Sequence, residues 1–275
     1  MIDQVDFYLE DLKSKFKKID FNEYYLAYSG GRDSHFVYWF IKNILKDDKI
    51  KVVSINTRLE HPQISTRMYN NADKVLIPEY TLEEIKEKVG VPCFTKHQDD
   101  FIGRYQRGSR AISTLSFVNG RENTKFTLNK YARDLLLNGK LHKISHKCCE
   151  YLKKKPFKKF EKETKLKPIV CVRASEGIMR EKYKGCLQKN GMFTPIFDLE
   201  DDLLKQIELK FNIEVPPIYK YLKRTGCMGC PYGRNTATEL SLLNSVQRNK
   251  TIEYFKESYK VKNVQLDLKQ LTQWL

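Results

Sequence analysis

The sequence predicts an α/β fold, a mostly parallel sheet with helices on both faces. Residues 24–28 are aromatic or apolar, as in a short buried strand, and a polar loop containing glycine follows them. From residue 34 to residue 45 the apolar residues recur every three or four positions, which indicates a helix. A second strand over residues 51–55 completes a βαβ unit of about 33 residues, whose two strands must run parallel.

The remaining elements continue this alternation. Residues 5–17 have the pattern of an amphipathic helix that packs on the core, and Ser34 is the expected N-cap of the helix after the loop. Further strands are expected at residues 75–77 and 168–172, and further helices at 82–89, 199–211 and 238–259. In such folds ligands bind beyond the C-terminal ends of the strands, where the loop after Tyr28 lies.

The loop Ser29-Gly30-Gly31-Arg32-Asp33-Ser34 has the composition of a phosphate site. Gly30 and Gly31 carry no Cβ, so the backbone can adopt unusual conformations and an anion can approach it closely. Loop N–H groups and the helix N-terminus favour negative charge, and the Arg32 guanidinium can fork onto phosphate oxygens. The alternative is an ordinary Gly-Gly turn between a strand and a helix.

This loop resembles the pyrophosphate loop, Ser-Gly-Gly-x-Asp-Ser, of the adenine nucleotide α-hydrolase (PP-loop) families. The resemblance implies a Rossmann-like, adenine nucleotide α-hydrolase-like fold that binds ATP with Mg²⁺, or an adenylated sulfur compound. Such families cleave ATP between the α and β phosphates. Arg32 stands where lysine is usual, which keeps the positive charge but presents it as a planar fork.

Seven cysteines without a secretory signal indicate reduced thiols rather than a disulfide framework. Cys148 and Cys149 are adjacent, and Cys227 and Cys230 form a C-x-x-C pair. Four soft thiolates select an iron–sulfur cluster or zinc, and a redox disulfide within the C-x-x-C pair is a third alternative. Because consecutive side chains diverge, the adjacent pair suits the separate irons of a [4Fe–4S] cluster better than one zinc ion.

The four cysteines and the loop together resemble the iron–sulfur form of the sulfonucleotide reductases, which act on adenylylsulfate and phosphoadenylylsulfate (PAPS). Residues 55–62 are similar to the family's Asp/Asn-Thr-Gly…Pro-Glu-Thr segment, and residues 171–176 to its Gly-x-Arg-x-x-Glu segment. Residues 224–233 resemble a signature of members carried by phages and modification systems. The resemblance covers about residues 22–260.

The resemblance implies a set of functional residues. Those expected to bind the nucleotide are Ser29, Gly30, Gly31, Arg32, Asp33, Ser34, Asn56 and Thr57. Those expected to act in catalysis are Arg32, Asp33, Arg173 and Glu176, and those expected to hold the cluster are Cys148, Cys149, Cys227 and Cys230.

Two features separate the chain from the true reductases. The true reductases resemble one another in a C-terminal cysteine that attacks the sulfate sulfur. In this chain no cysteine follows Cys230, so Cys186 or Cys93 would have to replace that nucleophile. The net charge of +16 indicates either an anionic partner, a nucleotide or a nucleic acid, or a charge that serves solubility alone. Both features favour a sister group resembling the ATP pyrophosphatases of DNA phosphorothioation and nucleic-acid thiolation.

We therefore expect an enzyme of sulfur metabolism that adenylates an acceptor, a nucleic acid, and receives sulfur from a donor protein such as a cysteine desulfurase. Sulfonucleotide reduction is the first alternative. A non-catalytic nucleotide-binding or nucleic-acid-binding module is the second.

A lysine-rich segment, residues 143–167, contains ten lysines and three glutamates. It either contacts a polyanion such as nucleic acid or forms a solvated surface. Tyr151, Phe157 and Phe160 interleave with the lysines, where they either stack on bases or form the apolar face of a helix.

Length and composition predict a cytoplasmic protein without membrane contact. The chain has 275 residues, of which 41% are hydrophobic, and no apolar run approaches the roughly 18 residues of a membrane span. The first residues lack the design of a signal peptide. We expect a packed N-terminal helix at residues 1–20, a nucleotide-binding domain with the iron–sulfur site at 21–235, and a helical extension at 236–275.

Overall fold

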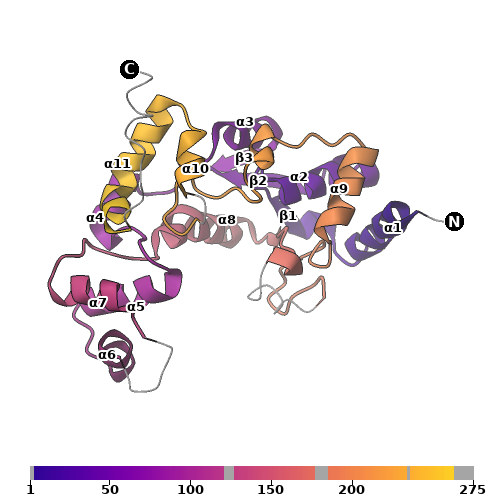
Figure 1. Cartoon of the computed structure of the whole chain (residues 1–275). Coiled ribbons are helices and arrows are strands. Elements are labelled where there is room, and N and C mark those ends of the chain that lie inside the picture. Colours follow the sequence, from indigo (N-terminus) through magenta and orange to yellow (C-terminus); the bar gives the residue numbers. More distant parts are fainter. Residues whose placement is uncertain (1–2, 121–126, 177–184, 234–235, 263–275) are drawn as a thin grey trace. The chain divides into compact units, whose positions relative to one another are not determined.

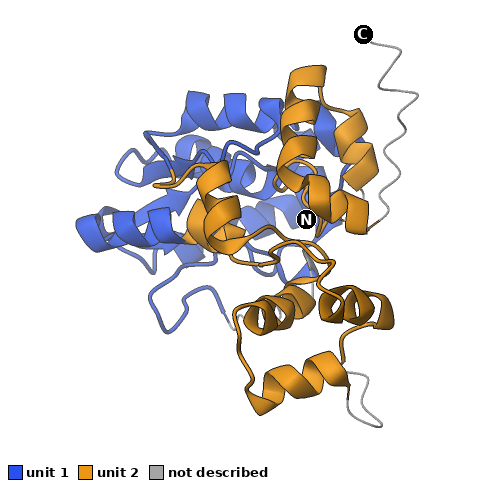
Figure 2. Ribbon diagram, turned by 90° about the vertical axis from the view of Figure 1, so that its left-hand side faces the viewer, with its two compact units in different colours: residues 1–77, 155–225 blue, residues 78–154, 226–275 orange. Residues whose placement is uncertain are grey.

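A computed structural model describes residues 3–120, 127–176, 185–233 and 236–262 of the chain. The chain divides into unit 1, residues 1–77 and 155–225, and unit 2, residues 78–154 and 226–275 (Figure 2). The three parts expected from the sequence remain a prediction. Within the described ranges, no helix combines the length and the apolar character needed to cross a bilayer.

Unit 1 contains a four-stranded parallel sheet in the order β3-β2-β1-β4. Figure 1 labels β1, β2 and β3. Its strands are β1 (Tyr24–Ala27), β2 (Lys51–Ile55), β3 (Lys74–Leu76) and β4 (Lys167–Ile169). Leu26 of the central strand β1 lies opposite Val52 on one side and Ile169 on the other. The predicted parallel βαβ unit is therefore confirmed, and the strand predicted at 168–172 begins and ends earlier.

Helices cover both faces of this sheet, which confirms the predicted α/β class. Tyr24, Leu26 and Tyr28 alternate onto one face, where they share a buried cluster with apolar side chains of several helices. Tyr25 points to the opposite face and packs against Phe160. The helical segments of unit 1 are α1 (Gln4–Phe16), η1 (Phe21–Glu23), α2 (Arg32–Trp39), the π-helical turn η2 (Phe40–Leu45), α3 (Pro62–Asn71), α8 (Lys155–Thr164), η4 (Ala174–Glu176), α9 (Asp201–Lys210) and η5 (Pro217–Lys220).

Unit 2 is helical in its described part. Its segments are α4 (Leu82–Val89), α5 (Lys96–Gln106), α6 (Ile112–Asn119), α7 (Lys130–Leu137), η3 (Glu150–Lys154), α10 (Thr236–Ser241) and α11 (Ser245–Val261). The sequence pattern predicted α4 correctly. It predicted one helix at 238–259, where the chain forms α10 and α11, and it did not predict α5, α6 or α7.

The aromatic residues of α8 pack on the sheet. The ring of Phe160 lies edge-on to Tyr25 at 5.1 Å, and the ring of Phe157 stacks on Tyr25 at 6.0 Å. Of the two roles open for these phenylalanines, the apolar face of a helix is the one that the structure supports. Lys158, Lys159 and Lys162 of α8 are exposed.

Candidate active site

The loop between β1 and α2 leaves the C-terminal end of the central strand. The N–H of Tyr28 donates to the carbonyl oxygen of Val53 at 2.9 Å, which extends the strand pairing by one residue. Gly30 then adopts a φ of +71°, where a Cβ would lie 2.8 Å from the carbonyl oxygen of Ile64. Glycine therefore meets both a conformational and a steric requirement here.

Two serine side chains hold the loop in shape. Ser29 Oγ accepts the N–H of Gly31 at 3.3 Å, and Ser34 Oγ accepts the N–H of Ser29 at 3.2 Å. Gly31 is the N-cap of α2, so the prediction that Ser34 is the N-cap was wrong. The N–H groups of Asp33 and Ser34 have no acceptor among the described residues. Such unpaired donors at a helix N-terminus can bind an anion.

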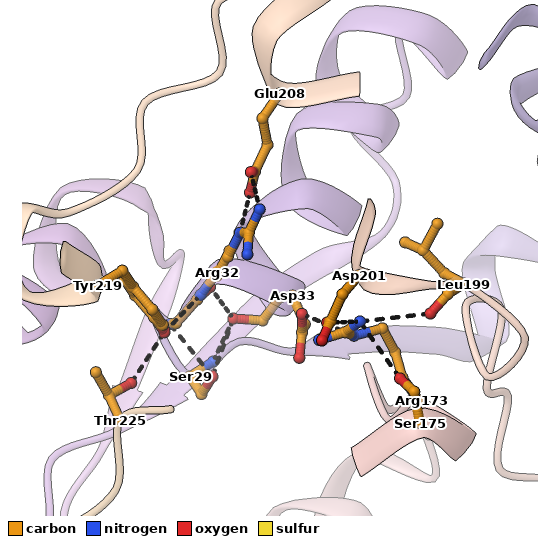
Figure 3. Close-up of polar contacts among 12 residues, drawn as sticks. Ser29, Arg32, Asp33, Arg173, Ser175, Leu199, Asp201, Glu208, Tyr219 and Thr225 are labelled. Atoms are coloured by element: carbon orange, nitrogen blue, oxygen red, sulfur yellow. Dashed lines mark hydrogen bonds and ion pairs between the residues drawn. The ribbon is translucent and has the colours of Figure 1, made fainter. Parts of the chain in front are cut away.

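Arg32 directs its guanidinium toward α9 (Figure 3). Nε donates to Oε1 of Glu208 at 2.6 Å, and Nη2 pairs with the second carboxylate oxygen. Glu208 is only 7% exposed, so water screens this two-pronged ion pair weakly. Arg32 thus joins α2 to α9. Its third guanidinium nitrogen, Nη1, has no hydrogen-bond partner within the described ranges.

Tyr219 closes the other side of the loop. Its hydroxyl accepts the N–H of Arg32 at 2.8 Å and lies 3.0 Å from Oγ1 of Thr225 (Figure 3). Burial raises the pKa of this phenol, so its proton is retained for donation. The sequence analysis missed Tyr219, because the residue stands far along the chain and no local pattern marks it.

Asp33 and Arg173, both expected from the sequence, are brought together. Nε of Arg173 lies 3.0 Å from Oδ1 of Asp33, and Nη1 of the same arginine pairs with Asp201 (Figure 3). Burial raises the pKa of the Asp33 carboxyl, whereas the charges of Arg173 and Arg32 act in the opposite direction. Arg173 is 7% exposed, so water screens its ion pair with Asp33 weakly.

These groups line a cavity of about 460 Å³ in unit 1, here called the unit 1 cavity. The charged side chains on its wall are Arg32, Asp33, Arg173, Asp201, Lys205, Lys223 and Arg224. Five of them are cationic and two are anionic, but Arg32 pairs with Glu208 and Arg173 pairs with both aspartates. The positive charge offered to an anionic ligand therefore comes from Lys205, Lys223 and Arg224. The parallel sheet with a strand–loop–helix site at its strand ends agrees with the predicted adenine nucleotide α-hydrolase-like fold.

The other predicted nucleotide residues lie outside the wall of this cavity. Asn56 and Thr57 follow β2, where the N–H of Thr57 donates to Oε2 of Glu60 at 3.0 Å and the Asn56 amide donates to the Tyr69 hydroxyl at 2.7 Å. The Thr57 hydroxyl also pairs with the Glu60 carboxylate, and Oδ1 of Asn56 accepts the N–H of Arg58 at 2.8 Å, so both side chains are engaged in local contacts. Glu176 ends η4, and its side chain is outside the part that the structure describes.

The four predicted cluster ligands all belong to unit 2. Gly229, between Cys227 and Cys230, has a φ of +59°, and a Cβ there would lie 2.5 Å from the Tyr259 hydroxyl. The N–H of Gly229 donates to the buried Glu239 carboxylate at 3.0 Å. Helices α10 and α11 thus fix the turn that carries the C-x-x-C pair.

The thiols of this group influence one another electrostatically. A hydrogen bond with Cys149, followed by burial and by Cys227 and Cys230, raises the pKa of Cys148. The same hydrogen bond lowers the pKa of Cys149, assisted by the charge of Lys153. Among the described side chains, no three His, Cys, Asp or Glu groups form a site for a metal ion. The sulfur ligands of a [4Fe–4S] cluster lie farther apart than those of a single metal ion, because each thiolate binds a different iron.

No protein-family model matches the chain, and no curated protein sequence matches it. A solved PAPS reductase from Candida auris, in a phosphate complex, is similar at 13% identity over 82% of this chain and 96% of that chain, with a TM-score of 0.46. An NH3-dependent NAD synthetase from Campylobacter jejuni, bound to nitrate, is similar at 15% identity over 94% of each chain, with a TM-score of 0.37. At these TM-scores neither similarity supports a particular function, so the proposals below depend on the residues of this chain.

Proposed function

We propose that this chain is a PP-loop enzyme that cleaves ATP between the α and β phosphates and transfers AMP to a nucleic-acid acceptor for sulfur incorporation. The observation that carries the proposal is the unit 1 cavity. It combines unpaired N–H donors at the start of α2, serine hydroxyls and several cations around one loop.

In the proposed reaction an acceptor oxygen attacks the α-phosphorus, and the bond to the bridging oxygen breaks. Pyrophosphate leaves with the electron pair, and the N–H groups of Asp33 and Ser34 stabilise its charge. Arg224 and Lys223 on the cavity wall attract the polyphosphate chain. A sulfur donor protein, such as a cysteine desulfurase, then supplies the sulfur that displaces AMP.

The resemblance implies two bound groups, Mg²⁺ and an iron–sulfur cluster, for which the chain offers candidate ligands. Asp33 and Asp201 are the carboxylates of the unit 1 cavity, and they would hold Mg²⁺, which neutralises phosphate charge when bound. Cys148, Cys149, Cys227 and Cys230 would hold a [4Fe–4S] cluster. This cluster would tie two distant segments of unit 2 together.

The charge of α8 supports a nucleic-acid acceptor. Lys158, Lys159 and Lys162 are exposed, whereas Phe157 and Phe160 of the same helix pack against Tyr25 of the sheet. The helix therefore presents positive charge without a stacking surface, which suits contacts with phosphates rather than with bases.

The burial of Cys93 and Cys171 disfavours either thiol as the nucleophile of the reductase alternative, which leaves the half-buried Cys186 as its candidate. Cys93 is fully buried, and burial raises its pKa to about 12. Cys171 lines the unit 1 cavity, but burial also raises its pKa well above the ordinary value. A thiol held protonated at neutral pH is a poor nucleophile.

Product analysis tests the proposal. Purified protein is incubated with Mg-ATP, with and without duplex DNA or transfer RNA, and separately with adenylylsulfate or PAPS plus thioredoxin. We expect AMP and pyrophosphate from ATP, and no sulfite. Asp33→Asn should lower turnover at least ~100-fold through lost positioning, whereas Asp202→Asn, an exposed change on α9, should not. Sulfite release without pyrophosphate would establish the reductase, and nucleotide binding without any product would establish the non-catalytic module.

A further inference from the structure

A second cavity, of about 520 Å³, lies within unit 2 and is here called the unit 2 cavity. Its wall is formed by the end of α4, by α5 and α7, and by residues 139–144. One part of this wall is apolar, with the side chains of Val89, Leu136, Leu141 and Ile144. The volume falls in the range typical of small-molecule sites, about 300–1,000 Å³.

The charged side chains of the unit 2 cavity are all cationic. Arg107, Arg110 and Lys143 line it and are exposed, and no carboxylate is among the described residues of its wall. Nζ of Lys143 donates to the carbonyl oxygen of Glu87 at 2.7 Å. A backbone carbonyl holds this lysine without neutralising its charge, so the cavity is suited to an anion.

Two arginines are held against the wall in defined positions. The guanidinium carbon of Arg110 lies 4.4 Å from the ring centroid of Tyr105, and Nη1 donates to the Tyr105 carbonyl oxygen at 3.2 Å. Arg107 folds back over α5, where a Cβ on Gly103 would lie 3.0 Å from its Nη1. The Arg110–Tyr105 stack therefore presents a flat, cationic surface beside the apolar wall.

We propose that the unit 2 cavity binds a nucleoside phosphate, either free or as an unpaired nucleotide of a nucleic-acid strand. The base lies on the apolar wall beside the Arg110–Tyr105 stack, because aromatic and guanidinium planes both stack on bases. Arg107 and Lys143 bind the phosphate, since a guanidinium fork and an ammonium group are the usual partners of phosphate oxygens. This inference does not depend on ATP cleavage in unit 1.

Equilibrium titration tests the inference with five probes: AMP, adenosine, ribose 5-phosphate, octanoate and a five-nucleotide oligodeoxyadenylate. Each is added to wild type, to the R107Q/R110Q double variant and to K130Q, a matched exposed cation on α7 outside the wall. AMP can also bind to the unit 1 cavity, so binding to the unit 2 cavity is identified as the part of the titration that is absent in the double variant. Both arginines are exposed, so the double variant should fold, and circular dichroism checks this.

We expect AMP or the oligonucleotide to bind at least tenfold more weakly to R107Q/R110Q and within twofold of wild type to K130Q. Adenosine and ribose 5-phosphate should each bind at least tenfold more weakly than AMP, because each lacks one half of the ligand. A preference for AMP identifies a free nucleotide as the ligand, and a preference for the oligonucleotide identifies a strand. Equal binding by wild type and the double variant, or binding of octanoate alone, would overturn the inference. Binding of magnesium pyrophosphate to the loop at residues 29–34 should be unchanged in the double variant, so this result is separate from the proposed function.

Discussion

Gly30 illustrates how one residue shapes the loop. Both Gly30 and Gly108 have positive φ, +71° and +86°, but a Cβ on Gly30 would meet Ile64 and Met68, whereas nothing lies within 4 Å of one on Gly108. Comparing the two positions therefore distinguishes the cost of a positive φ, which both share, from the cost of a steric clash, which only Gly30 has.

Gly108→Ala should lower the free energy of unfolding by about 1 kcal/mol, the ordinary cost of a left-handed alanine. Gly30→Ala should lower it by about 2–4 kcal/mol, since the loop must also move away from the backbone of Ile64. Urea unfolding of both variants measures the difference. Equal losses would show that the neighbours of Gly30 accommodate a methyl group.

His35 gives unit 1 a predictable acid sensitivity. Burial lowers its pKa to about 4 from 6.5, and its Nδ1 lies 2.9 Å from the Tyr28 hydroxyl. Because the folded pKa is below the unfolded one, the stabilising contribution of neutral His35 is complete above pH 6.5. It is lost as the pH falls toward 4.

Wild type should therefore lose about 2 kcal/mol more stability than His35→Gln between pH 7.5 and pH 4.5, after allowance for partial solvent screening. Urea unfolding at the two pH values measures this loss in both proteins. The result would be contradicted if the variant were as acid-sensitive as wild type.

The sequence indicated which residues form the loop, but it did not indicate which distant residues they contact. The spacing of Ser29, Gly30 and Gly31 after an apolar strand carries a local signal for a phosphate loop. Glu208 lies 176 positions from Arg32, and no periodicity connects the two. Sequence reasoning therefore assigned Arg32 to phosphate alone, whereas the structure gives it a carboxylate on α9.

At the scale of elements, the ion pair between Arg32 and Glu208 joins α2 to α9. Both side chains are largely shielded, with 19% and 8% exposure. Lys205 and Asp202 form an exposed pair on α9, with 57% and 86% exposure, and serve as the matched control. Removing one partner of a shielded pair leaves an uncompensated charge, which a surface pair does not.

Glu208→Leu alone should destabilise unit 1 by about 2–4 kcal/mol. The double variant with Arg32→Met should be less destabilised than the sum of the single changes, with a coupling energy above about 1 kcal/mol. The same cycle on Lys205 and Asp202 should give less than about 0.5 kcal/mol. Equal coupling in the two cycles would mean that the Arg32 pair contributes no more than a surface contact.

Helices α1, α4 and α9 were predicted from their amphipathic pattern. Helix α7 is amphipathic as well, and the sequence analysis missed it. Helix α5 has few apolar residues and α6 is apolar without a clear period, so neither carries an amphipathic signal. Contacts with neighbouring elements of unit 2 determine these helices instead, for example the stacking of Phe101 on Phe117 at 4.2 Å.

At the scale of the whole molecule, each of the two units is built from two separate segments of the chain. The phosphate loop belongs to unit 1 and the four cysteines to unit 2. In unit 2 the cysteine pairs come from segments 148–149 and 227–230, so a bound cluster would cross-link regions that are distant in sequence.

Protein purified without oxygen should contain about four irons per chain, as expected for a [4Fe–4S] site with four cysteine ligands. Serine in place of Cys148, Cys149, Cys227 or Cys230 should remove the iron and lower the thermal stability of the protein. Cys186→Ser, outside the group, is the control and should keep the iron. One zinc per chain, or iron retained in all four ligand variants, would contradict this assignment.

The most direct test of the central claim is calorimetric titration of magnesium pyrophosphate into the protein. Wild type should bind with a Kd in the micromolar range, and Ser29→Ala/Ser34→Ala should bind at least ~10-fold more weakly, since two hydroxyls that shape the loop are lost. ATP should compete for the same site. No binding by wild type at millimolar pyrophosphate, or equal affinity in the double variant, would show that the loop at 29–34 is not a phosphate site.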